Sequence, residues 1–391
     1  MSKHRSWIKI TITIRMHPHT PTLTHSHTPK TRKQQKKNMA EHGTNMVLTP
    51  LWTLPLDAVG QERPTVQLLG IREQDGQYSF DFTLLGRWID LAWAQGIRYF
   101  EMSHAFTQWG AAFTPKIMVE TANGLERRFG WHVAADSDEY RRFLSALMPE
   151  LQAFLRAKNL QGRCYFHVSD EPVEKDFEAY SRAAAFFTAL AEDFPVIDAL
   201  SSIDFYRKGV VRTPVPSTGA LEKFMAEEIP ERWCYYCSGR DCYPNRYIGL
   251  PSLRNRVLGL LLYINRMDGF LHWGYNGWYK RPLRDFHVNP YQDTEGGRFY
   301  NSGAGMLVYP GNDAPVDSLR HEVFREAMQD LRALQELEGR IGRERVVAIV
   351  QQGVPYPITM SRYPKDAGWY QNLIARVCKT VAEERTGTDN L

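Results

Sequence analysis

The chain of 391 residues has little cysteine and no long apolar run, and each shortage excludes a class of protein. Five cysteines are too few for the dense disulfide framework of small secreted domains. The longest apolar stretch, residues 257–264, is far shorter than the roughly 18–20 residues of a membrane-spanning helix. The sequence also lacks any Asn-x-Ser/Thr glycosylation acceptor. We therefore expect no membrane partner and a cytoplasmic location, unless a longer N-terminus carried an export signal.

Acidic residues are missing from residues 1–38, which instead carry nine Lys and Arg and five His among Thr and Pro. Such a segment buries too little apolar surface to offset the entropy lost on ordering, so we expect a disordered basic tail over 1–38. The rest of the chain holds 39 basic and 44 acidic residues, and we expect no nucleic acid partner. Binding of nucleic acid by the tail itself is a minor alternative, which deletion of the tail would test.

Short apolar segments alternate with amphipathic ones from residue 39 onward, which predicts strands alternating with helices. The expected strands are 45–54, 97–102, 163–168, 196–203, 232–237, 270–275 and 306–309, and the expected helices are 82–95, 140–155, 173–191, 221–228, 254–265, 319–337 and 369–383. This alternation is typical of βαβ units on a parallel sheet. We expect an α/β fold, a (β/α)8 TIM-type barrel over 39–340, followed by a helical extension over 341–391.

The seven expected strands leave the barrel short of its first βα unit, so that unit is expected to be lacking or replaced. Residues 39–43 are typical of the end of a preceding helix. A substitute strand could lie in residues 7–15, where isoleucine alternates strictly with other residues. Barrel strands are covered on both faces and are usually apolar throughout, so the alternation fits this position poorly.

Two adjacent carboxylates follow the expected strand 163–168, in the run His-Val-Ser-Asp-Glu-Pro at 167–172. Active sites of barrels lie at the carboxyl ends of their strands. One interpretation is a helix start, with Ser169 or Asp170 as N-cap and Pro172 at the first helical position. It does not explain Glu171 beside Asp170, where like charges raise the pKa of one carboxyl. Glycoside cleavage uses a protonated carboxyl near an ionised one, so Asp170 and Glu171 are the candidate catalytic residues.

Aromatic, imidazole and amide side chains gather at other strand ends, in the segments 101–110 and 272–279. Flat rings cover the apolar face of a sugar, while amides and imidazoles bind its hydroxyls. We therefore expect a carbohydrate substrate. The candidate substrate-binding residues are His104, Trp109, His167, Tyr235, Trp273, Tyr275, Asn276 and Trp278. The alternative is that Trp273 and Tyr275 simply fill the interior of the barrel.

The sequence favours no metal and no organic cofactor. Cys234, Cys237 and Cys242 could supply three zinc ligands, but no His or fourth Cys follows at finger spacing, and buried thiols are favoured. Gly303-x-Gly305 lacks the third glycine of a dinucleotide-binding motif, and the chain has no Gly-Lys-Ser/Thr phosphate-binding loop.

Three motifs, taken in order, resemble one protein family: the run at 167–172, Phe-Leu-His-Trp-Gly-Tyr-Asn at 270–276, and Val-Tyr-Pro-Gly at 308–311 followed by Asp-Ser-Leu-Arg at 317–320. They resemble the domain-of-unknown-function family 4091, whose characterised relatives are the glycoside hydrolase family 123 β-N-acetylgalactosaminidases. The resemblance extends from about Met39 to about Leu337. It implies a (β/α)8 barrel, often behind an N-terminal β-sandwich that we expect this chain to lack.

The resemblance also implies a β-N-acetylhexosaminidase-like glycosidase that acts by substrate-assisted retaining hydrolysis. Asp170 would orient the 2-acetamido group, whose carbonyl oxygen attacks the anomeric carbon, and Glu171 would serve as general acid and then general base. Two adjacent carboxylates then make sense, because the nucleophile belongs to the sugar. The alternative is a catalytically inactive truncated barrel that binds carbohydrate or acts as a scaffold. The exact sugar, the linkage, exo or endo action and the oligomeric state stay open.

Overall fold

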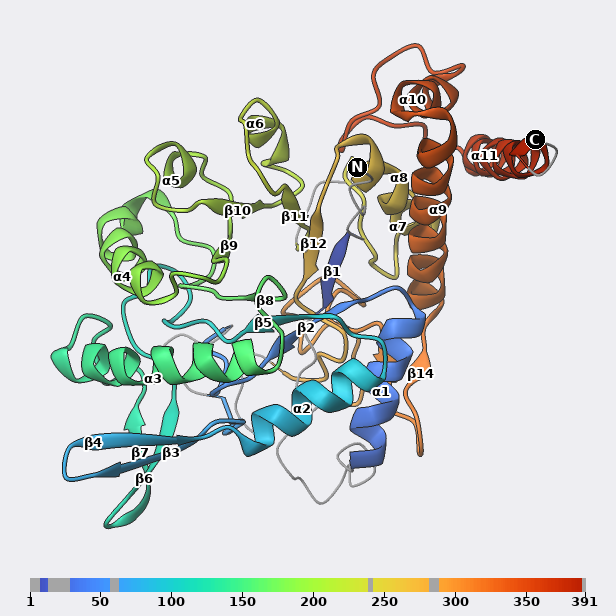
Figure 1. The fold of residues 1–391 in the computed structure, drawn as a ribbon. Coiled ribbons are helices and arrows are strands. Elements are labelled where there is room, and N and C mark those ends of the chain that lie inside the picture. The colour runs from blue at the N-terminus through green and yellow to red at the C-terminus, as the bar shows by residue number, and fades with distance from the viewer. Residues whose placement is uncertain (1–7, 13–28, 57–62, 238–241, 281–287, 389–391) are drawn as a thin grey trace.

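Parallel strands form the centre of the fold in the computed structural model, which describes residues 8–12, 29–56, 63–237, 242–280 and 288–388. These strands are β1 (Lys9–Ile12), β2 (Met46–Thr49), β5 (Tyr99–Met102), β8 (Cys164–Tyr165), β9 (Ile197–Leu200), β10 (Thr213–Pro216), β11 (Trp233–Tyr235) and β12 (Gly269–His272). Six form a curled sheet in the order β11-β12-β1-β2-β5-β8, and β9 and β10 form a separate parallel pair (Figure 1). Isolated parallel bridges join Phe166 to Val196 and Ser217 to Tyr235, so β9 and β10 continue the curl of the half-barrel.

The strand β1 occupies the place that the sequence left uncertain. It pairs in parallel with β12, from Lys9 opposite Gly269 to Ile12 opposite His272, and with β2. Helix α1 (Pro29–Glu41) precedes β2, so a first βα unit is present. The substitute strand expected within residues 7–15 is confirmed by β1, and the expectation that the unit is lacking is wrong. The prediction of a disordered tail is likewise wrong for residues 9–12 and 29–38, while residues 1–7 and 13–28 lie outside the described part of the chain.

The alternation of residues in β1 has a physical cause, because its two faces meet different surroundings. Ile10 packs into the apolar core outside the curl. The Thr11 hydroxyl donates to Glu101 Oε2 at 2.6 Å, and Lys9 Nζ lies 2.7 Å from Glu231 Oε1. The polar residues of β1 are therefore tolerated because carboxylates inside the curl pair with them.

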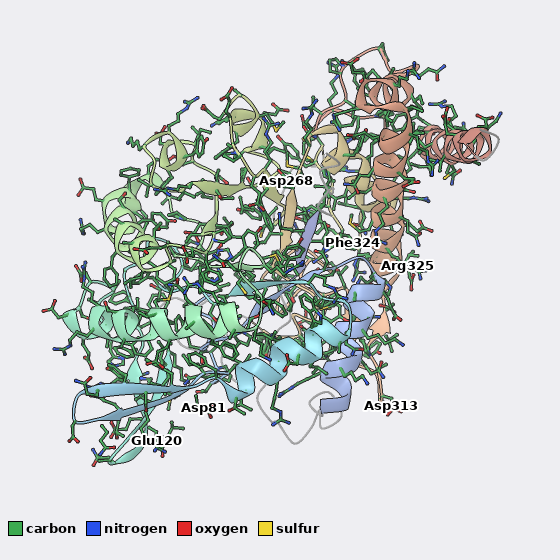
Figure 2. All side chains as sticks on the ribbon, in the orientation of Figure 1. Asp81, Glu120, Asp268, Asp313, Phe324 and Arg325 are labelled. Carbon is green, nitrogen blue, oxygen red and sulfur yellow. The ribbon has the colours of Figure 1, made fainter. Side chains whose placement is uncertain are left out.

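Helices flank the parallel sheet, and most of the sequence-predicted helices are present. They are α2 (Thr83–Ala94), α3 (Asp138–Ala157), α4 (Phe177–Leu190), α5 (Asp204–Arg207), α6 (Leu221–Met225), α7 (Leu253–Arg256), α8 (Leu258–Ile264) and α9 (Leu319–Ile341). Helices α10 (Arg343–Gln351) and α11 (Ala367–Thr388) pack on α9 (Figure 1). On α9, Phe324 is fully buried and faces the body, whereas Arg325 lies on the opposite side (Figure 2). None of the described helices combines the length and hydropathy that crossing a bilayer requires.

A small apolar cluster fills the inside of the curl. Its buried members are Met46, Tyr165, Ile197, Ala199, Val215, Trp233, Tyr235 and Leu271. Gly269 makes room for it, because a Cβ at this position would lie 2.1 Å from the Trp233 ring. Three members of this cluster, Ala199, Tyr235 and Leu271, also line the cavity described below.

Several strands were not predicted from the sequence. A four-stranded sheet projects from the body in the order β4-β3-β6-β7 and carries Asp81 and Glu120 (Figures 1 and 2). Its strands are β3 (Gly70–Gln74), β4 (Gln77–Asp81), β6 (Ile117–Thr121) and β7 (Gly124–Phe129). Much of this sheet is solvent-exposed and polar, so it gives little apolar signal.

Two expectations about the strands of the parallel sheet are also corrected. Strand β10 has the sequence Thr-Pro-Val-Pro, and proline cannot donate to a ladder, so the strand escaped prediction. The expected strand 306–309 lies outside the parallel sheet. Its last residues form β13 (Val308–Tyr309), which pairs in antiparallel fashion with β14 (Val316–Asp317).

Candidate active site

A cavity of about 630 Å³ lies at the carboxyl ends of β8, β9, β11 and β12. Among the described residues its lining combines carboxylates, aromatic rings and one arginine, Arg298. The lining residues are Gln108, Trp109, Asp170, Glu171, Ala199, Tyr235, Cys237, Tyr247, Leu271, Trp273, Gly277, Tyr279, Glu295, Arg298, Phe299, Tyr300, Asn301, Ser302 and Ala304. The cavity therefore lies where the fold class places active sites.

Asp170 and Glu171 lie in a loop rather than at the start of a helix. Helix α4 begins only at Phe177, after a short 3-10 turn, η2 (Glu174–Asp176). Ser169 does not cap that helix, because its hydroxyl donates to the Thr107 carbonyl at 2.7 Å. The interpretation of this segment as a helix start is therefore wrong, and both carboxylates reach the cavity.

Each of the two carboxylates accepts a hydrogen bond from a neutral side chain. Gln108 Nε2 donates to Asp170 Oδ2 at 2.7 Å, and the Tyr235 hydroxyl donates to Glu171 Oε1 at 2.6 Å. Burial, together with the nearby Glu171, holds the pKa of Tyr235 well above its usual range. Tyr235 therefore stays protonated, and so a hydrogen-bond donor, through the neutral pH range.

The backbone at the site is held in an unfavourable conformation. Glu171 has φ +47° and Trp109 has φ +60°, in the left-handed region that costs a non-glycine residue of order 1–3 kcal/mol. Two backbone hydrogen bonds maintain it: Glu171 N donates to Ala199 O, and Trp109 N donates to Asp170 O, both at 2.9 Å. The strained segments that carry the carboxylate and the ring are thus tied to β9 and to each other.

Beneath the cavity, His167 lies between two buried carboxylates. Its Nε2 is 2.9 Å from Glu101 Oε1, and its Nδ1 is 3.1 Å from Asp198 Oδ1. Burial alone would lower the pKa of His167, but the contacts with Asp198 and Glu101 raise it to about 10. His167 is therefore an imidazolium at neutral pH.

The structure brings five of the ten predicted site residues to the cavity. Trp109, Asp170, Glu171, Tyr235 and Trp273 all line it.

Two predicted substrate-binding residues, His104 and His167, are buried and do not line the cavity. Their rings stack with centroids 4.2 Å apart. Burial and the neighbouring His167 charge hold the pKa of His104 well below its usual range. We therefore correct the prediction that these two histidines contact the substrate, because the strand end turns them inward.

The last three predicted residues, Tyr275, Asn276 and Trp278, also lie outside the cavity lining and are buried. The Tyr275 hydroxyl donates to Asn38 Oδ1 at 2.7 Å, and Trp278 Nε1 donates to the Val308 carbonyl at 2.9 Å. Asn276 forms a backbone bridge with Met306. We therefore correct the prediction that these three residues bind substrate. Their side chains or backbone meet α1 and the 306–308 segment, whereas Gly277 and Tyr279 of the same loop do line the cavity.

Sequence reasoning included Gln108 and Tyr279 only within the segments 101–110 and 272–279. It missed Tyr247 and Tyr300 of the lining, and also the buried carboxylate of Asp198. The lining residues belong to loops that carry no periodic pattern. Asp198 did leave a signal, because it is a charged residue inside the apolar run Val-Ile-Asp-Ala-Leu. A buried charge of this kind requires a partner, which here is His167.

One group of potential metal ligands occurs in the described part of the chain, and it lies away from the cavity lining: His42, Asp317 and His321. The two imidazole rings stack with centroids 3.7 Å apart and an interplanar angle of 11°. Lone pairs in two parallel ring planes cannot converge on one ion, so this cluster does not suit a metal. Cys234, Cys237 and Cys242, the candidate zinc ligands, form no such group.

A curled parallel sheet with neighbouring acids in a ring-lined cavity at its strand ends is the arrangement of a glycoside hydrolase. Residues 7–337 match the family model of the glycoside hydrolase 123 catalytic domain. The chain belongs to that family. The match begins before β1 and ends within α9.

Several solved structures are similar to this chain. A family 123 glycoside hydrolase from Clostridium perfringens, studied for glycolipid glycan hydrolysis, is similar with a TM-score of 0.65 and 15% identity over 98% of this chain and 70% of that one. A β-galactosidase from Rahnella sp. R3 has a TM-score of 0.48 and 10% identity, covering 85% of this chain and 57% of that one. Comparison with curated proteins finds no match.

Proposed function

We propose that this glycoside hydrolase cleaves a β-linked 2-acetamido sugar, of the N-acetylgalactosaminide type, by substrate-assisted retaining catalysis. The observation that carries the proposal is the adjacency of Asp170 and Glu171, which both line one cavity. Adjacent carboxylates are too close to act on opposite faces of a sugar ring, but they suit a reaction in which the sugar supplies the nucleophile. The glycolipid glycan substrate of the similar Clostridium perfringens enzyme is compatible with this substrate class.

In the first step the acetamido carbonyl oxygen attacks the anomeric carbon while protonated Glu171 gives its proton to the glycosidic oxygen. The anomeric carbon–oxygen bond breaks, the aglycone leaves as an alcohol, and an oxazolinium ring forms on the sugar. Asp170 accepts a hydrogen bond from the acetamido N–H and stabilises the positive charge of that ring. In the second step Glu171 removes a proton from water, which attacks the anomeric carbon and reopens the ring with retained configuration.

The neighbours of the two carboxylates fit these roles. Because Tyr235 occupies Oε1 of Glu171, we assign proton transfer to Oε2. Gln108 fixes Oδ2 of Asp170 and so orients the plane of that carboxylate. The rings of Trp109 and Trp273 on the lining provide apolar surface for the C–H face of the sugar.

We further infer that the parallel strands close as a (β/α)8 barrel. The strands β8 and β9 meet at the Phe166–Val196 bridge, where Phe166 N donates to Pro195 O and Ile197 N donates to Phe166 O, both at 2.9 Å. The strands β10 and β11 meet at the Ser217–Tyr235 bridge. These two bridges support a closed ring of eight parallel strands.

The proposal is tested with Glu171→Gln and Asp170→Asn on an N-acetylgalactosaminyl disaccharide. General acid–base help contributes roughly 10²–10⁴-fold, so Glu171→Gln should lose about that factor in kcat. The loss should be smaller on an aryl glycoside, because an activated leaving group needs little protonation. Asp170→Asn should lose activity on both substrates. Glu178→Gln, an exposed change at the start of α4, is the matched control and should keep wild-type rates.

A second substrate decides whether the nucleophile belongs to the sugar. The corresponding galactoside lacks the 2-acetamido group and should not be hydrolysed. Comparable rates on the two sugars would exclude substrate assistance. Calorimetric binding of the disaccharide without any product after long incubation would instead favour a non-catalytic carbohydrate-binding protein.

A further inference from the structure

A chain of buried polar contacts extends from β1 to the segment that carries the two carboxylates. Thr11 Oγ1 donates to Glu101 Oε2 at 2.6 Å, and Glu101 Oε1 lies 2.9 Å from His167 Nε2. His167 Nδ1 lies 3.1 Å from Asp198 Oδ1, and the Tyr180 hydroxyl donates to Asp198 Oδ2. All five residues are at most 2% exposed. We call Thr11, Glu101, His167, Asp198 and Tyr180 the buried polar chain.

Asp198 connects this chain to the backbone of the active site. Besides His167 and Tyr180, its carboxylate accepts from Val168 N at 3.2 Å and from Ser169 N at 3.5 Å. These are the two residues before Asp170. The next residue of β9, Ala199, accepts from Glu171 N at 2.9 Å. Strand β9 therefore holds the loop on both sides of Asp170.

Protonated His167 offsets part of the negative charge that Glu101 and Asp198 bring into the buried polar chain. Glu101 faces it from β5, Asp198 faces it from β9, and His104 stacks on it from the loop after β5. Removing one partner from a buried charge pair leaves the other charge without compensation, which is strongly unfavourable. The contacts with the two carboxylates raise the pKa of His167 to about 10 despite burial. His167 therefore stays positively charged at neutral pH.

We propose that the buried polar chain is a positioning network for Asp170 and Glu171, and that β1, through Thr11, belongs to the catalytic apparatus. The proposal rests on the function proposed above. The five members are positioning residues, because none of them lines the cavity. Their effect on the reaction is geometric, since a misplacement of about 1 Å can cost on the order of 10²-fold in rate.

The first test compares Asp198→Asn with a matched change elsewhere. Asparagine replaces one acceptor oxygen by an NH₂ group that cannot accept from the amides of the loop. We expect kcat on an aryl β-N-acetylgalactosaminide to fall on the order of 10²-fold, with KM changed by less than about 3-fold. The control is Asp330→Asn. Asp330 is also buried and also accepts from a tyrosine, Tyr370, at 3.0 Å, but it lies on α9 and should leave kcat within about 2-fold.

The second test addresses β1. Thr11→Val removes the hydroxyl that serves Glu101 and should lower kcat on the order of 10-fold, since a hydrogen bond to a charged group is lost. Thr11→Ser keeps the hydroxyl and should restore most of the rate. The control Thr49→Val removes a buried hydroxyl from β2 whose contacts, with Val47 and Trp88, lie outside the network. This single-hydroxyl change tests the proposal even if Asp198→Asn fails to fold.

Two readouts that need no activity separate this proposal from the proposed function. Hydrogen exchange at the Val168 and Ser169 amides should accelerate in Asp198→Asn and stay unchanged in Asp330→Asn. Nitrogen NMR should show both ring nitrogens of His167 protonated near pH 8 in the wild type and not in Asp198→Asn. A wild type that hydrolyses no glycoside would refute the proposed function while these readouts still support the network. A neutral His167, or equal losses of kcat in Asp198→Asn and Asp330→Asn, would overturn the network.

Discussion

Two buried histidines in this molecule differ in charge at neutral pH, one a cation and the other neutral, although both contact a carboxylate through Nδ1. His167, beneath the cavity, has its pKa raised to about 10. His321, at the contact between α1 and α9, has its pKa lowered to about 4 by burial, which its hydrogen bond to Asp317 only partly offsets. Both side chains are fully buried. Burial by itself therefore does not decide the charge of a histidine.

The number and sign of the neighbours make the difference. His167 lies between two carboxylates, Glu101 and Asp198. His321 has one, Asp317, which is also held by Asn38 Nδ2 at 3.0 Å, and it stacks on the His42 ring. The cluster beneath the active site is thus built to hold a buried cation, whereas the cluster between α1 and α9 is built to hold a neutral ring.

The largest expected effect comes from removing the cation from the first cluster. His167→Gln leaves Glu101 and Asp198 buried without a compensating charge, so the free energy of unfolding should fall by about 3–5 kcal/mol. Urea denaturation at pH 7 measures the loss, with His132→Gln, an exposed change, as the control. A loss under about 1 kcal/mol would show that His167 is not a buried cation in the folded protein.

The second prediction concerns the acid limb of stability. The unfolded chain binds a proton at His321 near pH 6.5, but the folded chain binds it only near pH 4, so folding is weakened as pH falls between these values. By pH 4 the neutral His321 should have lowered the free energy of unfolding by about 3 kcal/mol relative to its value above pH 6.5. In His321→Asn, which keeps a donor for Asp317, the free energy of unfolding should depend less on pH over this range. Parallel curves for variant and wild type would contradict it.

His167 should behave in the opposite way. Because its folded pKa lies above that of the unfolded chain, its stabilising effect is complete below about pH 6.5 and is lost as pH rises toward 10. The burial of Lys36 lowers the pKa of that amine to about 7. This shift makes the free energy of unfolding rise with pH over a similar range, opposite to the effect of His167. The difference curve between wild type and His167→Gln therefore isolates the histidine.

The smallest expected effect lies at the edge of the second cluster. Glu322 is 40% exposed and contacts His42 Nε2 at 3.4 Å and Arg325 at 2.7 Å. Exposed ion pairs contribute little, so Glu322→Gln should change the free energy of unfolding by less than about 1 kcal/mol. Thermal denaturation of variant and wild type at low salt is the measurement. A larger loss would mean that the cluster depends on a second carboxylate, as the His167 cluster does.

Much of the fold could be predicted because amphipathic periodicity is local. The helices that became α2, α3, α4 and α9, and the apolar strands between them, follow from patterns within single segments. Strand β1 could not be placed in this way. Its four residues pair with β12, some 260 positions later, and its polar side chains are acceptable only because Glu101 and Glu231 face them.

The residues of the candidate site also divide into those that local sequence predicts and those that depend on distant contacts. Asp170 and Glu171 are neighbours in the sequence, and their position after a strand was enough to direct them to the cavity. Tyr275 and Trp278 share that sequence context with Trp273, yet they pack against Asn38 and Val308. Which way a ring points after a strand depends on the loop that follows it, and that loop is fixed by distant contacts.

The sequence by itself determined the alternation of strands and helices, the acidic pair and the family, since each is written in residues close together along the chain. Tertiary structure decided that β1 joins the sheet, that His167 keeps a proton, and which rings border the cavity. All three depend on contacts between distant segments. The proton on His167, for example, depends on Glu101 and Asp198, which come from two other strands, because the energy of a buried charge is set by the groups around it in space.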